Sequence, residues 1–450
     1  MSASIGFEKE LWNIACTLRG NMDASEYKQV ILGLIFLKYI SDRFESRYNE
    51  LVEEREGFEE DEDEYTAVNI FFVPEKARWR YILENAKSEE IGVIIDNAMR
   101  VIETRNKKLK NVLPKNFARV ELDKKKLGSV IEQFHNIKIE SEDKDILGRT
   151  YEYCLSQFAE QEGKKGGEFY TPTCIVETIV EILKPYKGRV YDPCCGSGGM
   201  FVQSKKFIDK HKRNINNISV YGQESNSTTW KLAIMNLCLR GIDANLGQYN
   251  SDTFINDIHP NLRADFIMAN PPFNLSNWGR DMLENDVRFK YGLPPDANAN
   301  FAWLQHMIYH LSEKGKMGMV LANGSLSSQS GGEGEIRTKI IKDDLVDCII
   351  AMPGQLFYTT AIPVCLWIIS KNKKQKGKTL FIDAREMGEM ETRKLRKLTK
   401  DEILKIAKVY EDYENGALED VKGFCKVATT EDIEKQDYIL TPGRYVGIAE

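Results

Sequence analysis

Seven short, apolar, β-rich runs alternate with helical stretches between about residue 189 and residue 371, and this alternation constrains the fold more than any other feature. The runs cover residues 189–193, 218–224, 244–250, 265–273, 316–323, 345–353 and 364–371. Several are apolar on both faces, as expected for strands of a sheet that helices cover on each side. The pattern predicts a doubly wound, Rossmann-like α/β sheet of seven strands, which binds ligands beyond the carboxyl ends of its strands.

The segments on either side of this region have helical patterns. Residues 25–54 place apolar side chains at helical spacing and contain one Gly and no Pro. Residues 399–416 begin with a capping box and end at a Gly. We predict three parts: an all-α N-terminal domain (1–145), the α/β domain (146–385) and a helical C-terminal tail (386–450) that contacts a partner.

The composition, with 42% hydrophobic and 29% charged residues, is that of an ordinary soluble protein. The start has no signal-peptide pattern, and the longest uncharged apolar stretch of the N-terminal part, residues 29–37, is shorter than the ~20 residues of a membrane span. The nine cysteines form no CxxC pair, and the five histidines have no clustered cysteines beside them. We therefore expect a cytoplasmic protein with reduced thiols, no metal and no membrane association.

Charge is distributed unevenly along the chain. The net charge is −6, so an affinity for nucleic acid needs a basic partner or a local basic surface. Residues 371–408 hold 13 Lys or Arg against 6 Asp or Glu, a local charge of +7. This stretch is either a solvated helix face or a surface for phosphates or an acidic partner. Residues 53–64, with nine acidic residues, are a solvated loop or, alternatively, a mimic of DNA charge.

A glycine-rich turn follows the first predicted strand and comprises Asp192, Gly196, Ser197, Gly198 and Gly199. Its glycines let the backbone approach a ligand closely before a helix begins. The spacing excludes a dinucleotide-binding fingerprint, because the position of its third glycine holds Phe201. Taken alone, the motif is best interpreted as a tight turn between a strand and a helix.

Two acidic residues follow the next two strands. Glu224 ends the second strand and is well placed to accept hydrogen bonds from ribose hydroxyls. Asp252 follows the third strand and can accept a hydrogen bond from the exocyclic amine of an adenine. Standing alone, Glu224 would be a helix-capping acid, and Asp252 can be both a helix N-cap and a ligand contact.

The fourth strand ends in the tetrapeptide Asn270, Pro271, Pro272 and Phe273. Two successive prolines end the ladder of a sheet and stiffen the backbone. The Asn270 side-chain oxygen and the Pro271 carbonyl then form a rigid pair of acceptors for a planar amino group, and Phe273 offers a face on which a base can stack. A strand-ending turn without function is the alternative.

A pair of acceptors of this kind suits methyl transfer to an amine. An exocyclic amino nitrogen is a poor nucleophile because its lone pair is delocalised into the ring. Two acceptors on its protons favour a more tetrahedral nitrogen and stabilise the positive charge that develops mainly in the transition state. A base inside a duplex does not reach such a pocket and must be flipped out.

A further motif, GEFYTP, lies upstream at residues 167–172. Phe169, Tyr170 and Thr171 are candidates to wall a small ligand, and Pro172 opens a helix. Taken alone, this signal is weak.

In this order, the motifs GEFYTP, DPCCGSGGM, GQESN, SDTF and ANPPFN resemble those of the amino-adenine DNA methyltransferases that use S-adenosylmethionine. More closely, nearly the whole chain is similar to the modification subunits of type I restriction–modification systems. The resemblance implies methyl transfer to N6 of a flipped adenine in duplex DNA by the catalytic residues Asn270, Pro271, Pro272 and Phe273. It implies cofactor binding by Phe169, Tyr170, Thr171, Asp192, Gly196, Ser197, Gly198, Gly199, Glu224 and Asp252. One departure is Cys194, where the family often carries a smaller residue such as Ala.

The resemblance also implies partners. Target recognition would fall to a separate specificity subunit, because the chain shows no recognition domain of its own. Two copies of this chain would join one specificity subunit, and an ATP-dependent restriction subunit would join for cleavage. Double-stranded DNA is the expected substrate, and this chain itself should neither hydrolyse ATP nor cut DNA.

Two alternatives stay open: a methyltransferase that acts on RNA guanine or protein glutamine, and a non-catalytic assembly subunit of a DNA-binding complex. Pro193-Cys194 spells the dipeptide of cytosine C5-methyltransferases, but it lies in the glycine-rich turn rather than at the fourth strand end. His306 and His310 stand four residues apart without the Glu of a zincin motif, and we predict them to be core or surface positions of a helix.

Overall fold

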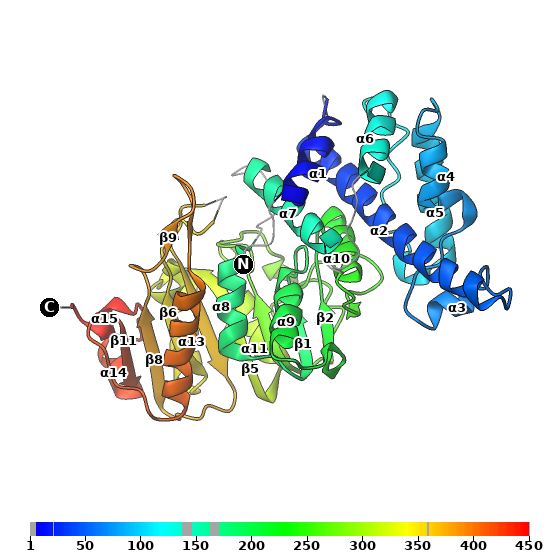
Figure 1. The fold of residues 1–450 in the computed structure, drawn as a ribbon. Coiled ribbons are helices and arrows are strands. Elements are labelled where there is room, and N and C mark those ends of the chain that lie inside the picture. The colour runs from blue at the N-terminus through cyan, green and yellow to red at the C-terminus, as the bar shows by residue number, and fades with distance from the viewer. Residues whose placement is uncertain (1–5, 21, 137–145, 163–170, 358–359, 450) are drawn as a thin grey trace. The chain divides into compact units, whose positions relative to one another are not determined.

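The structure is a computed structural model of the 450-residue chain. It describes residues 6–20, 22–136, 146–162, 171–357 and 360–449. Two compact units divide the chain: the first comprises residues 1–163 and 231–241, and the second residues 164–230 and 242–450. The first unit is helical and the second contains a large sheet covered by helices, which confirms the predicted fold class (Figure 1). Within the described ranges, no helix combines the length and the apolar character that a membrane crossing requires.

The first unit is built around one long helix. Its elements are α1 (Gly6–Cys16), α2 (Ala24–Glu54), α3 (Glu62–Thr66), the 3₁₀ helix η1 (Glu75–Ala77), α4 (Trp79–Glu84), α5 (Ile91–Arg105), η2 (Lys107–Leu109), α6 (Lys124–Asn136) and α7 (Ile146–Glu162), together with part of α10 (Ser227–Leu239). Residues 30–41 of α2 are buried at every position, as expected of a helix that neighbours surround. At Gly33 a side-chain carbon would lie 2.4 Å from Pro114, so this close packing requires glycine.

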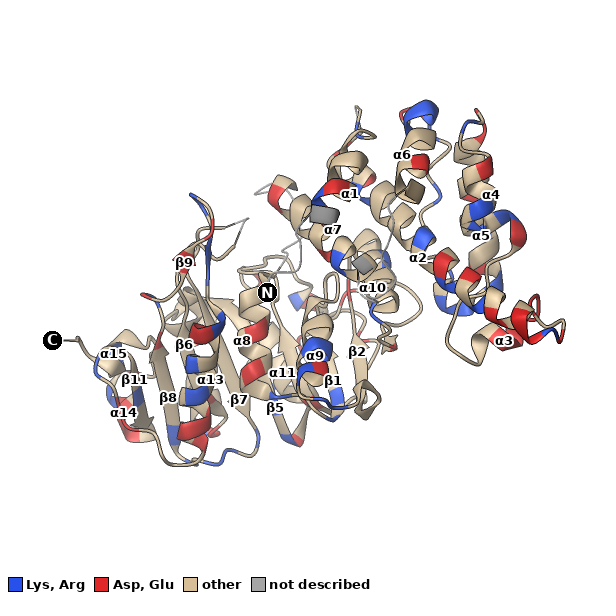
Figure 2. Ribbon diagram, viewed as in Figure 1, with Lys and Arg blue, Asp and Glu red and all other residues tan. Residues whose placement is uncertain are grey.

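The acidic run 53–64 connects α2 with α3 and is mostly exposed (Figure 2). Three of its residues form ion pairs with arginines of the same unit: Glu60 with Arg78, Glu62 with Arg105, and Glu64 with Arg47. Pairs that are this exposed contribute roughly 0–1 kcal/mol each. The run is therefore a solvated segment with local ion pairs, which favours that interpretation over the mimicry of DNA.

The second unit contains a nine-stranded sheet with the strand order β11-β8-β6-β7-β5-β4-β1-β2-β3. Its strands are β1 (Gly188–Asp192), β2 (Ile218–Gly222), β3 (Ala244–Asn245), β4 (Ala264–Ala269), β5 (Leu311–Ala322), β6 (Val346–Ala351), β7 (Val364–Ser370), β8 (Lys378–Asp383) and β11 (Cys425–Thr429). The first seven correspond to the seven predicted strands, and β8 and β11 are two more than the sequence pattern predicted. The segment after residue 385 is thus not only helical, because it supplies the edge strand β11.

Helices cover both faces of this sheet. Helix α8 (Thr173–Leu183) packs against both α9 (Gly199–Lys210) and α13 (Lys400–Glu414), and Figure 1 shows α8 and α13 in front of the sheet. The other face carries α11 (Asn300–His310) and α12 (Glu333–Lys342). Alternate residues of strand β5 face the two helical layers. A side-chain carbon at Gly318 would lie 2.8 Å from Ile179 of α8 on one face. Met317 and Met319 point to the other face, where they pack in one core with Phe301 of α11. The chain ends with α14 (Thr430–Lys435) and α15 (Gly443–Val446).

The strand directions bring the predicted motifs to one edge of the sheet. Asp192 at the end of β1 pairs in parallel register with Gly222 of β2, and Tyr191 pairs with Ile267 of β4. Strand β7 is antiparallel to both β5 and β6, and β8 is parallel to β6, so β6 and β8 run in the same direction as β1. The loops after β1, β2, β4, β6 and β8 therefore all lie at one edge, which we call the carboxyl edge. A separate two-stranded sheet, β9 (Glu389–Met390) with β10 (Arg396–Lys397), follows β8.

Candidate active site

The glycine-rich turn after β1 leaves open space beside its backbone. Gly196 and Gly198 have φ angles of +54° and +87°, a region that favours glycine. A side-chain carbon built at Gly196 or Gly199 would meet no atom of the described chain within 4 Å. Helix α9 begins at Gly199, so the turn also presents the positive end of a helix to this space.

Glu224 connects the end of β2 with this turn. Its Oε2 accepts a hydrogen bond from the Gly196 N–H at 2.9 Å, and its Oε1 accepts one from the Asn226 N–H at 3.1 Å. The side chain is half-buried. The carboxylate therefore offers acceptors to a ligand that occupies the space beside the turn.

Asp252 lies on a loop that is bonded to both neighbouring strand ends. The Ser251 N–H donates to the Glu224 carbonyl at 2.9 Å, and the Thr253 hydroxyl donates to the Pro193 carbonyl at 2.5 Å. Asp252 Oδ1 accepts from the backbone N–H groups two and three residues further on, at 2.9 and 3.0 Å. The capping interpretation of Asp252 therefore holds, and its exposed side chain remains accessible to a ligand.

Asn270 is oriented by a hydrogen bond to the segment that precedes α8. Its Nδ2 donates to Thr171 Oγ1 at 2.9 Å, which brings two predicted motifs 99 residues apart into direct contact. Asn270 Oδ1 is buried and has no hydrogen-bond partner among the described residues. An unsatisfied buried acceptor costs about 1–3 kcal/mol, so a donor from a ligand is favoured at this oxygen. Phe169 and Tyr170, also predicted for this site, lie outside the described residues.

The rest of the tetrapeptide is partly accessible. Pro271 is buried, whereas Pro272 and Phe273 are half-buried. The Phe273 ring packs edge-on against Phe357, with the ring centroids 5.7 Å apart. Phe357 lies on the loop after β6 and was not predicted from the sequence. This loop thus adds an aromatic wall beside the end of β4.

Burial changes the protonation of the residues at the glycine-rich turn. Burial raises the pKa of Asp192 to about 8, and the negative charge of Glu224 adds to the rise. The hydrogen bond that Asp192 Oδ1 accepts from the Cys194 N–H at 3.0 Å lowers the pKa, but by less than burial raises it. Asp192 is therefore largely protonated at neutral pH. Desolvation also raises the pKa of the Cys194 and Cys195 thiols well above their ordinary value. A thiolate nucleophile is thus disfavoured, which argues against the chemistry of the cytosine C5-methyltransferases.

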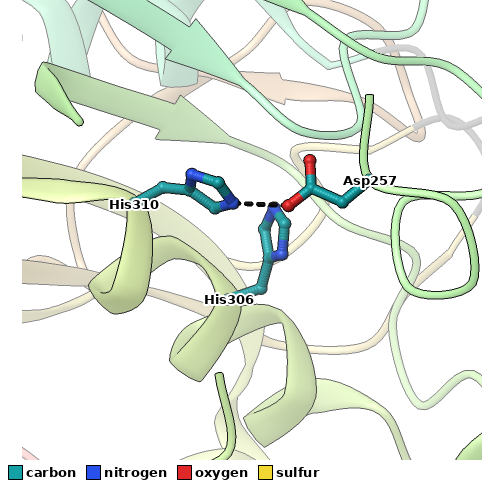
Figure 3. Close-up of side chains that lie close together, drawn as sticks. All are labelled: Asp257, His306 and His310. Atoms are coloured by element: carbon teal, nitrogen blue, oxygen red, sulfur yellow. Dashed lines mark hydrogen bonds and ion pairs between the residues drawn. The ribbon is translucent and has the colours of Figure 1, made fainter. Parts of the chain in front are cut away.

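A buried cluster of Asp257, His306 and His310 adjoins these loops (Figure 3). His310 Nε2 lies 2.7 Å from Asp257 Oδ2, and its Nδ1 lies 2.8 Å from the Leu262 carbonyl oxygen. Both ring nitrogens of His310 therefore lie within hydrogen-bond distance of an oxygen atom, which fixes the orientation of the ring between Asp257 and the Leu262 carbonyl. Burial raises the pKa of Asp257, but the hydrogen bond from His310, the electrostatic effect of the two neighbouring histidines and the hydrogen bond from the His259 N–H together outweigh it, and the pKa falls to about 2.

His306 faces different partners. Its Nδ1 lies 3.1 Å from the Arg288 guanidinium, which only donates, so the proton is on Nε2, 2.9 Å from the Tyr191 hydroxyl. Burial lowers the pKa of His306 well below its ordinary value. The ligand atoms of the cluster lie within 4.8 Å of one another, as a metal site would need. Asp257 and His310 are hydrogen-bonded to each other, whereas His306 faces the Tyr191 hydroxyl and the Arg288 guanidinium, so protein groups already occupy the potential metal-ligand atoms.

Arg288 extends this network to the loop of Asp252. It lies between β4 and α11 and donates to the carbonyls of Thr253 and Phe254 at 3.0 and 2.5 Å, directly after Asp252. Its guanidinium also pairs with Asp286 at 2.9 Å. Sequence reasoning missed Arg288, because a single arginine in an irregular segment has no pattern that distinguishes it.

The fold and the carboxyl edge together define a class of protein. A doubly wound sheet carries a glycine-rich turn and two acceptor carboxylates after β1, β2 and β3, and an Asn-Pro-Pro-Phe turn after β4. This is the arrangement predicted for a methyltransferase that acts on an amino group.

Comparisons with known proteins extend this result. Residues 142–450 match the family model described as N-6 DNA Methylase, and residues 7–134 match that of the HsdM N-terminal domain. The chain belongs to the methylase subunits of type I restriction enzymes, a family of N6-adenine DNA methyltransferases.

Individual relatives cover most of the chain. The methylase subunit of the type I restriction enzyme HindI from Haemophilus influenzae is 49% identical over 400 residues, which cover 84% of this chain and 90% of that protein. The MjaIX methylase subunit from Methanocaldococcus jannaschii is 40% identical over 474 residues, covering 98% and 84%. A crystal structure of a type I restriction-modification methyltransferase subunit from Streptococcus thermophilus matches with a TM-score of 0.85 at 27% identity, covering 98% of both chains.

Proposed function

We propose that this chain transfers a methyl group from S-adenosylmethionine to N6 of an adenine that is flipped out of duplex DNA. The observation that carries the proposal is the state of Asn270. Its amide is held by Thr171, and its Oδ1 is buried without a partner among the described residues. An exocyclic amino group offers the donor that this oxygen lacks. Membership in the N6-adenine methylase family supports the same substrate.

The residues of the carboxyl edge fit S-adenosylmethionine. Gly196 and Gly199 leave space at the backbone, Glu224 offers a carboxylate to ribose hydroxyls, and Asp252 offers an exposed acceptor to the adenine amine. When bound, this cofactor supplies a methyl group on a sulfonium, which is already a strong leaving group. The protein therefore needs no nucleophile of its own, in keeping with the raised thiol pKa values at the turn.

The tetrapeptide acts on the target amine. Asn270 Oδ1 and the Pro271 carbonyl would accept hydrogen bonds from the two N6 protons, and the lone pair would become localised on nitrogen as its bond to the methyl carbon forms and the bond from that carbon to sulfur breaks. The methylated nitrogen would then lose one of its two protons. The two prolines keep this acceptor pair rigid, and Phe273 provides a ring face for the base. Asn270 Oδ1 is buried in this structure, so a base reaches it only after the atoms that cover it move. Positioning of the amine in line with the methyl group carries most of the rate enhancement.

The same proposal includes partners. A specificity subunit carries target recognition, two copies of this chain join it, and an ATP-dependent restriction subunit joins for cleavage. The net charge of −6 supports this division, because it leaves DNA affinity to a partner or to a local basic surface.

A methyl-acceptor assay with a radiolabelled donor tests the proposed function. The chain, assembled with its specificity subunit, is offered unmethylated duplex DNA, total RNA and a protein extract in parallel. We expect label in DNA alone, and mass spectrometry of the digested DNA to show N6-methyladenine. Label in RNA guanine or in protein glutamine would contradict the proposal, and no transfer to any acceptor would favour the non-catalytic alternative.

A further inference from the structure

The basic stretch 371–408 is divided between the two ends of β8. Lys374 and Lys376 lie on the loop before β8, at the edge opposite to the proposed active site. A second group of cations follows β8 and therefore starts from the carboxyl edge. This group is carried by the β9–β10 hairpin, residues 386–398, which we call the basic ribbon. Figure 1 shows β9 standing beyond the end of the large sheet.

The tip and second strand of the basic ribbon carry positive charge alone. Residues 392–397 hold four cations, Arg393, Lys394, Arg396 and Lys397, and no acidic residue, whereas residues 386–391 hold three glutamates. Figure 2 shows both charges on the hairpin, and Lys397 pairs with Glu389 at 3.9 Å. Arg393 and Lys394 are exposed, and within the part of the chain that the structure describes neither has an ion pair or a side-chain hydrogen bond. The charge at the tip is therefore available to an anionic partner.

The basic ribbon is held firmly at its base. The Arg396 N–H donates to the Gln355 carbonyl at 2.8 Å, and the Arg396 guanidinium donates to the Gly388 carbonyl at 3.1 Å. The Gly388 N–H donates to the Glu402 carboxylate at 2.7 Å, and Leu395 is buried. The cations at the tip thus project from a fixed base.

The base of the basic ribbon is also connected to the target pocket. Gln355, which accepts the Arg396 hydrogen bond, lies on the loop after β6, two residues before Phe357. Phe357 packs edge-on against Phe273 of the tetrapeptide. The basic ribbon and the proposed adenine pocket therefore share one loop.

We propose that the basic ribbon binds DNA phosphates beside the extruded base. This inference rests on the proposed function, because a nucleotide that enters the pocket brings its flanking backbone to the carboxyl edge. A duplex backbone is favoured over an acidic protein surface, because the loop that anchors the ribbon also walls the pocket for the base. The contact is to phosphates, so it is independent of the DNA sequence.

The test compares salt-dependent DNA binding of two charge-matched double variants. The first is Arg393→Gln with Lys394→Gln, at the tip of the ribbon. The second is Lys374→Gln with Lys376→Gln, at the opposite edge. Each is assembled with the specificity subunit, and binding to a fluorescent duplex is measured over a series of KCl concentrations. S-adenosylmethionine affinity and assembly of the complex are measured in parallel.

For the ribbon variant we expect the dissociation constant for DNA to rise at least about tenfold at low salt, and the slope of log K against log salt to become shallower by about 2 for each copy of the chain that contacts DNA. Its cofactor affinity and its assembly should match the wild type. The opposite-edge variant should match the wild type in DNA affinity and slope. Equal slopes for the wild type and both variants would overturn the inference.

Two other results are also decisive. If the ribbon variant fails to assemble with the specificity subunit, the surface binds protein and the phosphate assignment is wrong. If the wild-type complex binds DNA but transfers no methyl group, the proposed function fails, while the binding comparison still decides the role of the ribbon.

Discussion

At the scale of single residues, the hydrogen bond from Asn270 Nδ2 to Thr171 fixes the orientation of a buried amide whose oxygen has no partner among the described residues. We expect Thr171→Val to lower the rate of methyl transfer roughly 2- to 10-fold, because one hydrogen bond of about 0.5–1.5 kcal/mol no longer orients the amide. Thr171→Ser keeps the hydroxyl and should stay near the wild-type rate. Single-turnover methylation measures both, and an unchanged rate in the valine variant would show that the contact does not orient Asn270.

Glu224 makes a second residue-scale prediction. Replacing it with Gln removes the charged acceptor beside the glycine-rich turn, and hydrogen bonds to charged groups contribute about 1.5–3 kcal/mol. Titration calorimetry should therefore show S-adenosylmethionine binding weakened by about 10- to 100-fold. The exposed Glu419→Gln serves as the control for the loss of one negative charge. Equal affinities in the two variants would remove Glu224 from the cofactor site.

The protonation of Asp192 predicts a pH dependence of stability. Burial raises its pKa from 3.8 to about 8, so between these values the folded state holds a proton that the unfolded chain releases. The contribution of Asp192 to the free energy of unfolding is therefore present at low pH and lost as the pH rises through about 8. The free energies of unfolding of the wild type and Asp192→Asn, measured with a denaturant, should therefore change differently with pH between about 4 and 8. A constant difference between the two proteins from pH 4 to pH 8 would contradict the assignment.

The site residues that could be predicted from the sequence are those that lie within a short motif at the end of a strand. Asn270 and Glu224 follow strand ends in short, distinctive runs, so their positions could be predicted. Their partners could not, because the Thr171 contact joins segments 99 residues apart. Arg288 and Phe357 had no signal at all, since each stands alone in an irregular segment and gains its role only from tertiary packing.

At the scale of elements, the two strands that were missed have weak patterns. β8 follows a lysine-rich loop and has only four buried residues, and β11 is an edge strand in which two of five residues are buried. Six of the seven predicted strands are mostly buried or alternate clearly, so their apolar runs were recognisable, whereas β3 has two residues and neither is buried. The division of the chain at residues 145 and 385 stays a prediction, although the contribution of β11 to the sheet argues that the last segment packs with the α/β part.

The loop of Asp252 depends on the buried network behind it. Arg288→Gln leaves two buried carbonyls and the Asp286 carboxylate without their cation, so we expect the free energy of unfolding to fall by about 3 kcal/mol. Cofactor affinity should fall as well, because Asp252 directly precedes these carbonyls. Urea denaturation and calorimetry measure the two effects. The exposed Arg213→Gln should change neither, and a similar result for both variants would show that the network does not position the loop.

At the scale of the whole molecule, the proposed ligand contacts gather in one unit and at one edge. The glycine-rich turn, the tetrapeptide and the basic ribbon all belong to residues 164–230 and 242–450. Parallel strand directions explain this convergence, because motifs that are far apart in sequence all follow carboxyl ends. The net charge of −6 contrasts with the four cations of residues 392–397, so the proposed contact with DNA is local and does not depend on the overall field of the molecule.

The most direct test of the proposed function measures two quantities for the variant Asn270→Ala: its rate of methyl transfer to DNA and its affinity for S-adenosylmethionine. The exposed Asn372→Ala is the matched control. We predict that Asn270→Ala binds the cofactor nearly as the wild type does and loses methyl transfer to adenine by about a hundredfold or more, because the acceptor for the amine is gone. Wild-type turnover in this variant, with the cofactor bound normally, would contradict the central claim.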